Sequence, residues 1–270
     1  MRKERTKAEK ARRIQDTLEG YRRFDYDYIA FGNDWEIPDG KYRYRQPWYE
    51  RILTGFWRVL LGVFGPLLIR VLYGAKTYGR KNVRALKGRG AISVCNHFNH
   101  LDTLFVRDAI GHFRSFHTMA PWNNKGGLGG HIIRHGGMWP FSNNVTATKN
   151  LMREMGKRLH EGKIVNFYAE QAMWINYQKP RPMKEGAFHY AVKFNVPVLP
   201  VFCTFQKNAN GHIKKLRIHT MPAIYPDEML PAKERAHAMR AAAEAAWREC
   251  YKRAYGIPLK YLPDRRKGLC

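Results

Sequence analysis

An alternation of strand-like and helix-like segments constrains the fold of this chain more than any other feature of its sequence. From Gly79 onward, short apolar runs typical of strands alternate with stretches of helical periodicity. The expected strands are 91–95, 113–120, 164–168, 196–205 and 216–224, and the expected helices are 146–160, 186–195 and 232–254. The Gly-rich stretch 126–144 is expected to be a loop. This pattern predicts the α/β class, with a mixed sheet flanked by helices.

The stretch 91–106, AISVCNHFNHLDTLFV, predicts a buried strand, a polar turn and the start of a helix. Asn99 is expected to be the helix N-cap, because its side-chain oxygen can accept a free backbone N–H. Asp102 would then lie in the first turn, where the helix dipole favours a carboxylate. Across the turn, Asp102 can reach back to the imidazole of His97, which is how a base is oriented. A lone histidine at a strand end is more often structural, but this spacing favours a functional pair.

A second cluster of charged residues follows the expected strand 164–168. Glu170 lies just past that strand, where α/β folds place their sites. Lys179, Arg181 and Lys184 follow in a loop interrupted by prolines. A carboxylate followed by several cations suits the binding of a polar, phosphorylated group. The alternative interpretation is a solvated basic loop.

The segment 47–73 is rich in aromatic and aliphatic residues. Its longest uncharged run, between Arg58 and Arg70, has 11 residues, whereas a membrane-spanning helix needs about 20. Gly65-Pro66 is expected to divide the segment into two helices. Trp, Tyr and Arg at the edges suit a membrane interface, with the arginines reaching toward lipid head groups. The alternative is a buried helical hairpin in the core.

The charge of the chain restricts its partners. Lys and Arg number 48 against 22 Asp and Glu, a formal net charge of +26. Such a surface attracts nucleic acid, anionic lipid, phosphorylated substrates or acidic carrier proteins. The sequence contains no RNP, KH or helix-turn-helix signature, and its aromatics are embedded among aliphatic residues, which disfavours a nucleic-acid-binding protein.

Metal sites and disulfides are not expected. The four cysteines are scattered, without C-x-x-C spacing, and are interpreted as reduced thiols of a cytoplasmic protein. His97 with His100, or His131 with His135, could supply metal ligands. The second pair is flanked by glycines and has no acidic or Cys ligand nearby. We therefore expect no metal and no bound cofactor.

Several motifs resemble those of the glycerolipid acyltransferase family. NHFNHLD resembles the family signature NHxSxxD, with Asn99 in place of serine. FYAEQAMW lies where the family has FPEGTRS, and MKEGAFHYAVKFNVPVLPVF resembles the family's K-x-GA helix and V-P-V-x-P-V strand. The resemblance covers roughly 71–226. Gln171, Ala172 and Met173 replace GTR, so the arginine that contacts the acceptor phosphate in the family is missing. Asn143 of GGMWPFSNN lies near the position of a second family arginine.

The resemblance implies an activity and its residues. His97 would be the general base and Asp102 its orienting acid, and the substrate-binding residues would be Asn96, Glu170, Arg181 and Lys184. The expected reaction transfers an acyl chain from an acyl-CoA or acyl carrier protein thioester to a lysophospholipid hydroxyl. The favoured acceptor is 1-acylglycerol-3-phosphate, giving phosphatidic acid; another lysophospholipid or polar lipid remains an alternative.

The chain is expected to have four parts. Residues 1–46 form a basic and aromatic extension without the apolar region of a secretory signal, and 47–78 form amphipathic membrane-interface helices. The catalytic core covers 79–230, and 231–270 form a C-terminal helix and tail. We expect a peripheral or monotopic protein on the cytoplasmic face of the cell membrane, with an anionic membrane surface as a partner and no nucleic acid.

Overall fold

The centre of the molecule is a seven-stranded mixed sheet. A computed structural model describes residues 38–44, 47–124, 126–208 and 210–261. The strands are β1 (Lys76–Tyr78), β2 (Ala91–Cys95), β3 (Ser115–Met119), β4 (Met138–Pro140), β5 (Ile164–Tyr168), β6 (Val198–Lys207) and β7 (Ile213–Thr220). Their spatial order is β1-β7-β6-β2-β5-β3-β4. The strands from β6 to β4 run parallel, β7 is antiparallel to β6, and β1 is parallel to β7. The predicted mixed α/β sheet is therefore confirmed.

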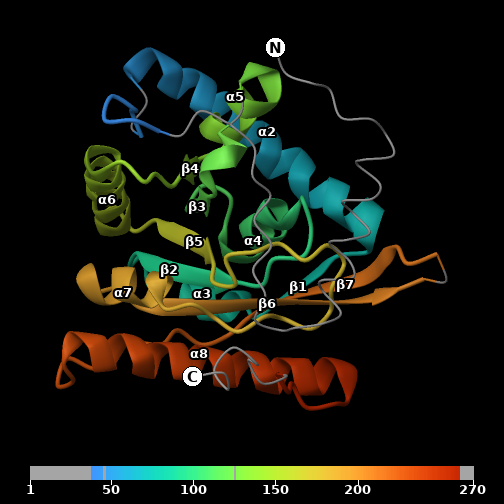
Figure 1. Cartoon of the computed structure of the whole chain (residues 1–270). Helices are drawn as coiled ribbons and strands as arrows, with labels where there is room; N and C mark the ends of the chain where they lie inside the picture. Colours follow the sequence, from blue (N-terminus) through green and yellow to red (C-terminus); the bar gives the residue numbers. More distant parts are fainter. Residues whose placement is uncertain (1–37, 45–46, 125, 209, 262–270) are drawn as a thin grey trace, which may run out of the picture.

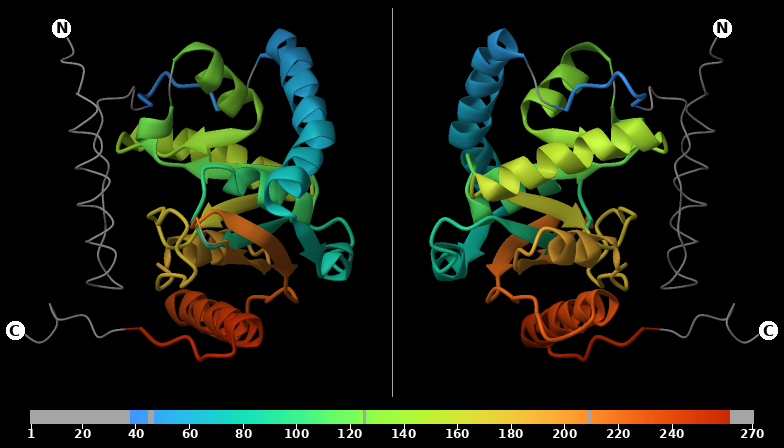
Figure 2. Two further views of the ribbon diagram at one scale, coloured as in Figure 1. Left: turned by 90° about the vertical axis from the view of Figure 1, so that its right-hand side faces the viewer. Right: turned by 90° about the vertical axis from the view of Figure 1, so that its left-hand side faces the viewer.

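Helices cover both faces of this sheet (Figures 1 and 2). One side carries α2 (Trp48–Tyr73) and α4 (Asp102–Ile110), with the short α3 (Arg80–Arg84) and α5 (Gly127–His135) near them. The other side carries α6 (Val145–His160), α7 (Gly186–Lys193) and α8 (Ala232–Tyr255). A 3₁₀ turn, η1 (Pro121–Asn123), follows β3. The expected helices therefore match α6, α7 and α8 closely.

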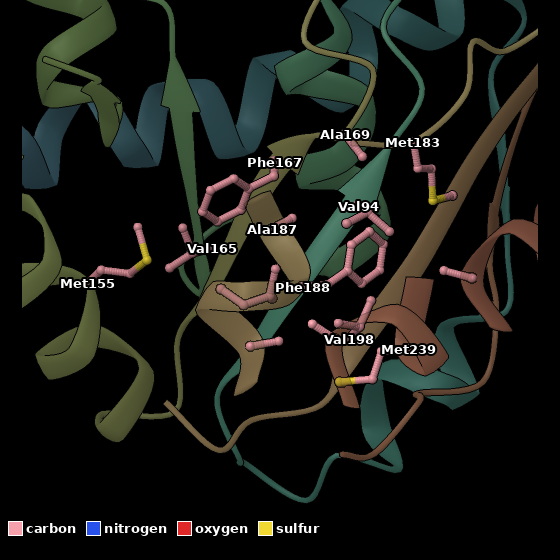
Figure 3. Close-up of a cluster of buried hydrophobic side chains, with 14 of the residues drawn as sticks. Val94, Met155, Val165, Phe167, Ala169, Met183, Ala187, Phe188, Val198 and Met239 are labelled. Carbon is pink, nitrogen blue, oxygen red and sulfur yellow. The ribbon is translucent and has the colours of Figure 1, made fainter. Parts of the chain in front are cut away.

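Two apolar clusters fill the space between these layers. All five residues of β2 are buried, as expected for a central parallel strand covered on both faces. On one side, Phe188 of α7 lies close to Val94 and Val198 of the sheet (Figure 3). The other cluster joins α2 and α4 to β2, β6 and β7. The loop that follows β2 is thus attached to a rigid frame.

The structure contradicts the expectation of two helices in 47–73. Helix α2 is continuous over 26 residues with Pro66 inside it, and it ends at Gly74, which adopts the left-handed conformation. A proline inside a helix removes one backbone hydrogen bond, but packing on α4 holds the two halves in line. If Gly65 carried a Cβ atom, that atom would lie only 3.2 Å from the side chain of Leu104 on α4, so the two helices are closely packed at this glycine.

Two of the three arginines of α2, Arg58 and Arg70, differ from the expectation that they reach toward lipid head groups. Arg58 is buried and donates to the carbonyl oxygens of His112 and Ser115, each at 3.1 Å. Burial lowers the pKa of Arg58 to about 10. Arg70 is half-exposed and pairs with the buried Asp108 at 3.3 Å. Both arginines therefore fasten α2 to the protein body.

The remaining face of α2 is an exposed apolar surface, so the alternative of a buried helical hairpin is wrong. Its exposed large side chains are Trp48, Tyr49, Ile52, Leu53, Phe56, Val59, Val63, Phe64, Leu67, Leu68, Val71 and Leu72. By length and composition alone, α2 is also apolar enough to cross a membrane, and 17% of its most apolar window is buried. This surface is suited to an apolar environment.

Two further differences concern local structure. The stretch 126–144, expected to be a loop, contains α5 and β4, and contacts with α2 and β3 stabilise these short elements despite their glycines. Strand β1 and helix α3 were not predicted. The predictions for residues 1–37 lie outside the described residues.

Candidate active site

The predicted pair lies at the carboxyl ends of the central strands, with His97 in the loop after β2 and Asp102 at the first residue of α4. His97 Nδ1 lies 2.7 Å from Asp102 Oδ2. The same oxygen accepts the backbone N–H groups of Phe98, at 2.8 Å, and Asn99, at 3.0 Å. Asp102 is therefore bonded to the loop that carries His97 as well as to its ring.

Asn99 has a different role from the one predicted. The helix begins at Asp102 and its N-cap position is Leu101, with no side-chain cap bond there. The side-chain oxygen of Asn99 instead accepts the N–H of Leu101 at 2.9 Å, which closes a local turn before the helix. The N-cap prediction is wrong by two residues, but the turn it implied is present.

Burial distinguishes the two members of the pair. The side chain of Asp102 is 2% exposed and that of His97 is 23% exposed. Burial raises the pKa of Asp102 above its ordinary value, and the bonds to His97, Asn99 and Phe98 oppose that effect. The arrangement places a buried carboxylate behind a partly accessible imidazole. With Nδ1–H donating to Asp102, Nε2 is the nitrogen that can accept a proton.

Glu170 lies beside this loop but is directed into the protein. Its Oε1 accepts the backbone N–H of His97 at 3.1 Å, and its Oε2 accepts that of Arg181 at 3.0 Å. Burial raises its pKa to about 8, although these two hydrogen bonds act in the opposite direction. Glu170, predicted to bind substrate, therefore connects the His97 loop to the segment after β5.

The two predicted cations after β5 lie in different environments. The guanidinium of Arg181 lies over the ring of Trp174, 3.6 Å from its centroid, and the residue is buried. Lys184 is exposed, and its backbone N–H donates to the carbonyl of Ala169 at 2.8 Å. The backbone N–H of Trp174 donates to the carbonyl of His97 at 3.0 Å. This loop is thus joined directly to the His97 loop.

Asn96, predicted to bind substrate, is buried and bonded to the neighbouring strand β6. Its amide nitrogen donates to the carbonyl of Cys203 at 3.0 Å, and its amide oxygen accepts the N–H of the same residue at 2.8 Å. The side chain is 2% exposed. Asn96 therefore extends the bonding between β2 and β6 by one residue and fixes where the His97 loop begins.

Sequence reasoning missed one aromatic neighbour of the pair. The ring of Tyr168 stacks on the imidazole of His97, with centroids 3.9 Å apart and planes 14° apart. Tyr168 is the last residue of β5 and pairs in register with Cys95. The only sequence signal was its position two residues before Glu170.

The expected thiols and histidines occupy separate places. Cys95, Cys203 and Cys250 are buried free cysteines. His131 and His135 have ring centroids 4.0 Å apart, and Nδ1 of His135 lies 2.9 Å from Thr54 Oγ1. Within the described ranges, no three His, Cys, Asp or Glu side chains are grouped so as to hold a metal ion.

A buried carboxylate behind an accessible histidine, at the strand ends of an α/β sheet, defines a candidate acid–base site. Residues 75–204 match the family model described as Acyltransferase, and this range contains His97, Asp102 and Glu170. These 130 residues, just under half of the chain, are therefore similar to an acyltransferase domain, in agreement with the resemblance to the glycerolipid acyltransferases.

One solved structure extends the comparison beyond the matched domain. The chain is similar to the crystal structure of the 1-acyl-sn-glycerophosphate (LPA) acyltransferase PlsC from Thermotoga maritima, with a TM-score of 0.55 and 17% sequence identity. The alignment covers 73% of this chain and 81% of that one. At this identity the similarity shows a common fold. No curated protein sequence matches the chain significantly.

Proposed function

We propose that this acyltransferase moves an acyl chain from a thioester to the hydroxyl of a lysophospholipid, with His97 as general base. The observation that carries the proposal is the bond between His97 Nδ1 and Asp102 Oδ2 at 2.7 Å. It fixes the tautomer in which Nε2 is unprotonated, and it places a negative charge where the imidazolium forms.

The reaction needs one proton to move from the acceptor hydroxyl to His97 and then from His97 to the leaving sulfur. Nε2 takes the proton of the acceptor hydroxyl while the hydroxyl oxygen attacks the thioester carbonyl carbon. The carbon–sulfur bond then breaks, and the leaving thiolate takes the proton from His97 to become a free thiol. Asp102 keeps the ring oriented and stabilises its protonated form. The products are an ester and a free thiol, and no cofactor takes part.

For the acceptor, we propose a phosphate-bearing lysophospholipid, with 1-acylglycerol-3-phosphate first. The printed name of the similar Thermotoga maritima enzyme supports this choice. Lys179, Arg181 and Lys184 are the cations that follow the position where the family's arginine is missing. Because Arg181 stacks on Trp174 and Lys184 is exposed, a different lysophospholipid or polar lipid is the alternative acceptor.

We further propose that the exposed face of α2 rests in the interfacial region of a membrane. Twelve large apolar side chains are exposed on this helix, and such a face is stabilised by burial among lipid chains. The net charge of +26 supports an anionic surface on the cytoplasmic side. The same charge would attract the phosphates of acyl-CoA or an acidic acyl carrier protein.

The test is an acceptor panel with the detergent-solubilised full-length chain. Acyl-CoA and acyl carrier protein thioesters are each combined with 1-acylglycerol-3-phosphate, other lysophospholipids and glycerol-3-phosphate, and the lipid products are identified by mass spectrometry. We expect an acylated product from at least one lysophospholipid and thiol release in equal amount. Thioester hydrolysis without any acylated lipid would contradict the proposal.

A further inference from the structure

Tyr168, whose ring stacks on the imidazole of His97, has no role in the reaction described above. The ring of Tyr168 lies nearly parallel to that of His97, with 3.9 Å between centroids and 14° between planes. Stacked aromatic rings attract one another, and a cation over an aromatic face is stabilised by the electrons of that face. The stack thus concerns both the orientation and the charge of His97.

The position of this ring is set by the sheet. Tyr168 ends β5, which lies between β2 and β3, and it is the register partner of Cys95. Two residues beyond Tyr168, Glu170 accepts the N–H of His97. The residues at the end of β5 therefore contact His97 twice. The Glu170 carboxylate bonds its backbone N–H, and the Tyr168 ring stacks on its imidazole.

The contacts of the Tyr168 side chain show which part of it acts. Its hydroxyl oxygen is buried and makes no hydrogen bond with the described residues. Burial, with a smaller effect of the nearby Asp102, raises the pKa of the Tyr168 phenol well above its usual range. The phenol therefore stays neutral, and the contribution to His97 comes from the ring.

We propose that Tyr168 is a positioning residue whose ring holds the imidazole of His97 against Asp102 and stabilises its protonated form. The inference rests on the proposed function of His97 as general base. Nδ1 is fixed by Asp102 at one edge of the ring, and Tyr168 closes one face, so Nε2 is left pointing at the acceptor hydroxyl. The stack becomes stronger when His97 takes the proton, which lowers the barrier of that step.

The activity test compares Tyr168→Leu with Tyr168→Phe in full-length protein, using the best substrate pair from the acceptor panel. Tyr168→Leu should lower kcat about three- to thirtyfold, leave KM within about twofold, and move the acid side of the pH–rate profile to lower pH. Tyr168→Phe should restore most of the wild-type kcat. Tyr78 stacks on His219 at 5.5 Å on the sheet edge, so Tyr78→Leu is the matched control and should leave the kinetics unchanged.

A spectroscopic readout separates this inference from the proposed function. In proton NMR, a stacked ring moves the imidazole signals of His97, which are assigned as those missing from His97→Ala. These signals should move back in Tyr168→Leu and stay in place in Tyr168→Phe and Tyr78→Leu. If wild-type protein transfers no acyl group, the proposed function fails, and the NMR result alone decides whether the Tyr168 ring stacks on the His97 imidazole.

Three results would overturn the inference: wild-type kcat in Tyr168→Leu, unchanged His97 signals in that variant, or an equal loss of kcat in Tyr168→Phe. Tyr168→Met, whose longer and more flexible side chain can adapt to the same space, replaces Tyr168→Leu if the leucine variant does not fold.

Discussion

Replacing Asp102 with asparagine separates the two tasks that the structure gives this residue. One oxygen, Oδ2, accepts from His97 Nδ1 and from the N–H groups of Phe98 and Asn99. An amide oxygen can still accept all three, so the loop keeps its shape. The lost property is the negative charge, which at about 4 Å and an effective dielectric constant of about 20 attracts an imidazolium by about 4 kcal/mol.

A loss of about 4 kcal/mol in the transition state corresponds to a fall of about 10³-fold in kcat. Thiol release from the thioester measures that rate, and urea unfolding measures stability. Asp102→Asn should unfold within about 1 kcal/mol of wild type, whereas Asp102→Ala, which leaves two N–H groups unbonded, should lose about 2–6 kcal/mol. An Asp102→Asn variant with more than a tenth of wild-type kcat would refute the charge argument, and one as unstable as Asp102→Ala would refute the geometric one.

Three further predictions concern stability and membrane binding. The pKa of Glu170 is raised from 4.5 to about 8, so the free energy of unfolding should fall by about 1.4 kcal/mol per pH unit as pH rises between these values. In urea unfolding, Glu170→Gln should lack this pH dependence, and an unchanged pH dependence in that variant would contradict the prediction. Asp108→Ala should lose about 1–3 kcal/mol in the same assay, because its arginine partners are half-exposed and can be rehydrated; a loss below the error of the assay would contradict the structural role of Asp108. Phe64→Glu on the exposed face of α2 should weaken sedimentation with anionic vesicles at least about tenfold, whereas Ala241→Glu on the exposed surface of α8 should not; equal binding by both would argue against α2 as the membrane contact.

The parts of the site that local sequence could predict are those made by neighbouring residues. The turn between His97 and Asp102 follows from an apolar strand, a polar stretch and a renewed helical pattern, and the structure brings the two side chains together. Strands β2 and β5 begin and end where their apolar runs do. Each of these features is fixed within a few residues of chain.

Features that depend on contacts distant in sequence could not be predicted in the same way. Proline rules favour a break at Pro66, but the packing of Gly65 on Leu104 keeps α2 continuous. Arg58 was assigned to the membrane interface from its position at the edge of an apolar run, because only the folded chain brings the carbonyls of His112 and Ser115 to it.

The same limit applies within the site. The register of β5 against β2 brings Tyr168 and Glu170 to the His97 loop, and the pairing of β6 with β2 brings Cys203 to Asn96. Sequence placed Asn96, Tyr168 and Glu170 at or just past strand ends and Cys203 inside a strand, but it could not show which of them contact one another.

The central claim is that His97 takes the proton of a lipid hydroxyl during acyl transfer. The direct measurement is formation of acylated lipid by wild type and His97→Ala, with the same thioester, the same acceptor and matched folded protein. We predict acylated product from wild type and a loss of at least about 10³-fold in His97→Ala, with unfolding free energies within about 1 kcal/mol of each other. Product formation by His97→Ala at a rate close to that of wild type would contradict the account.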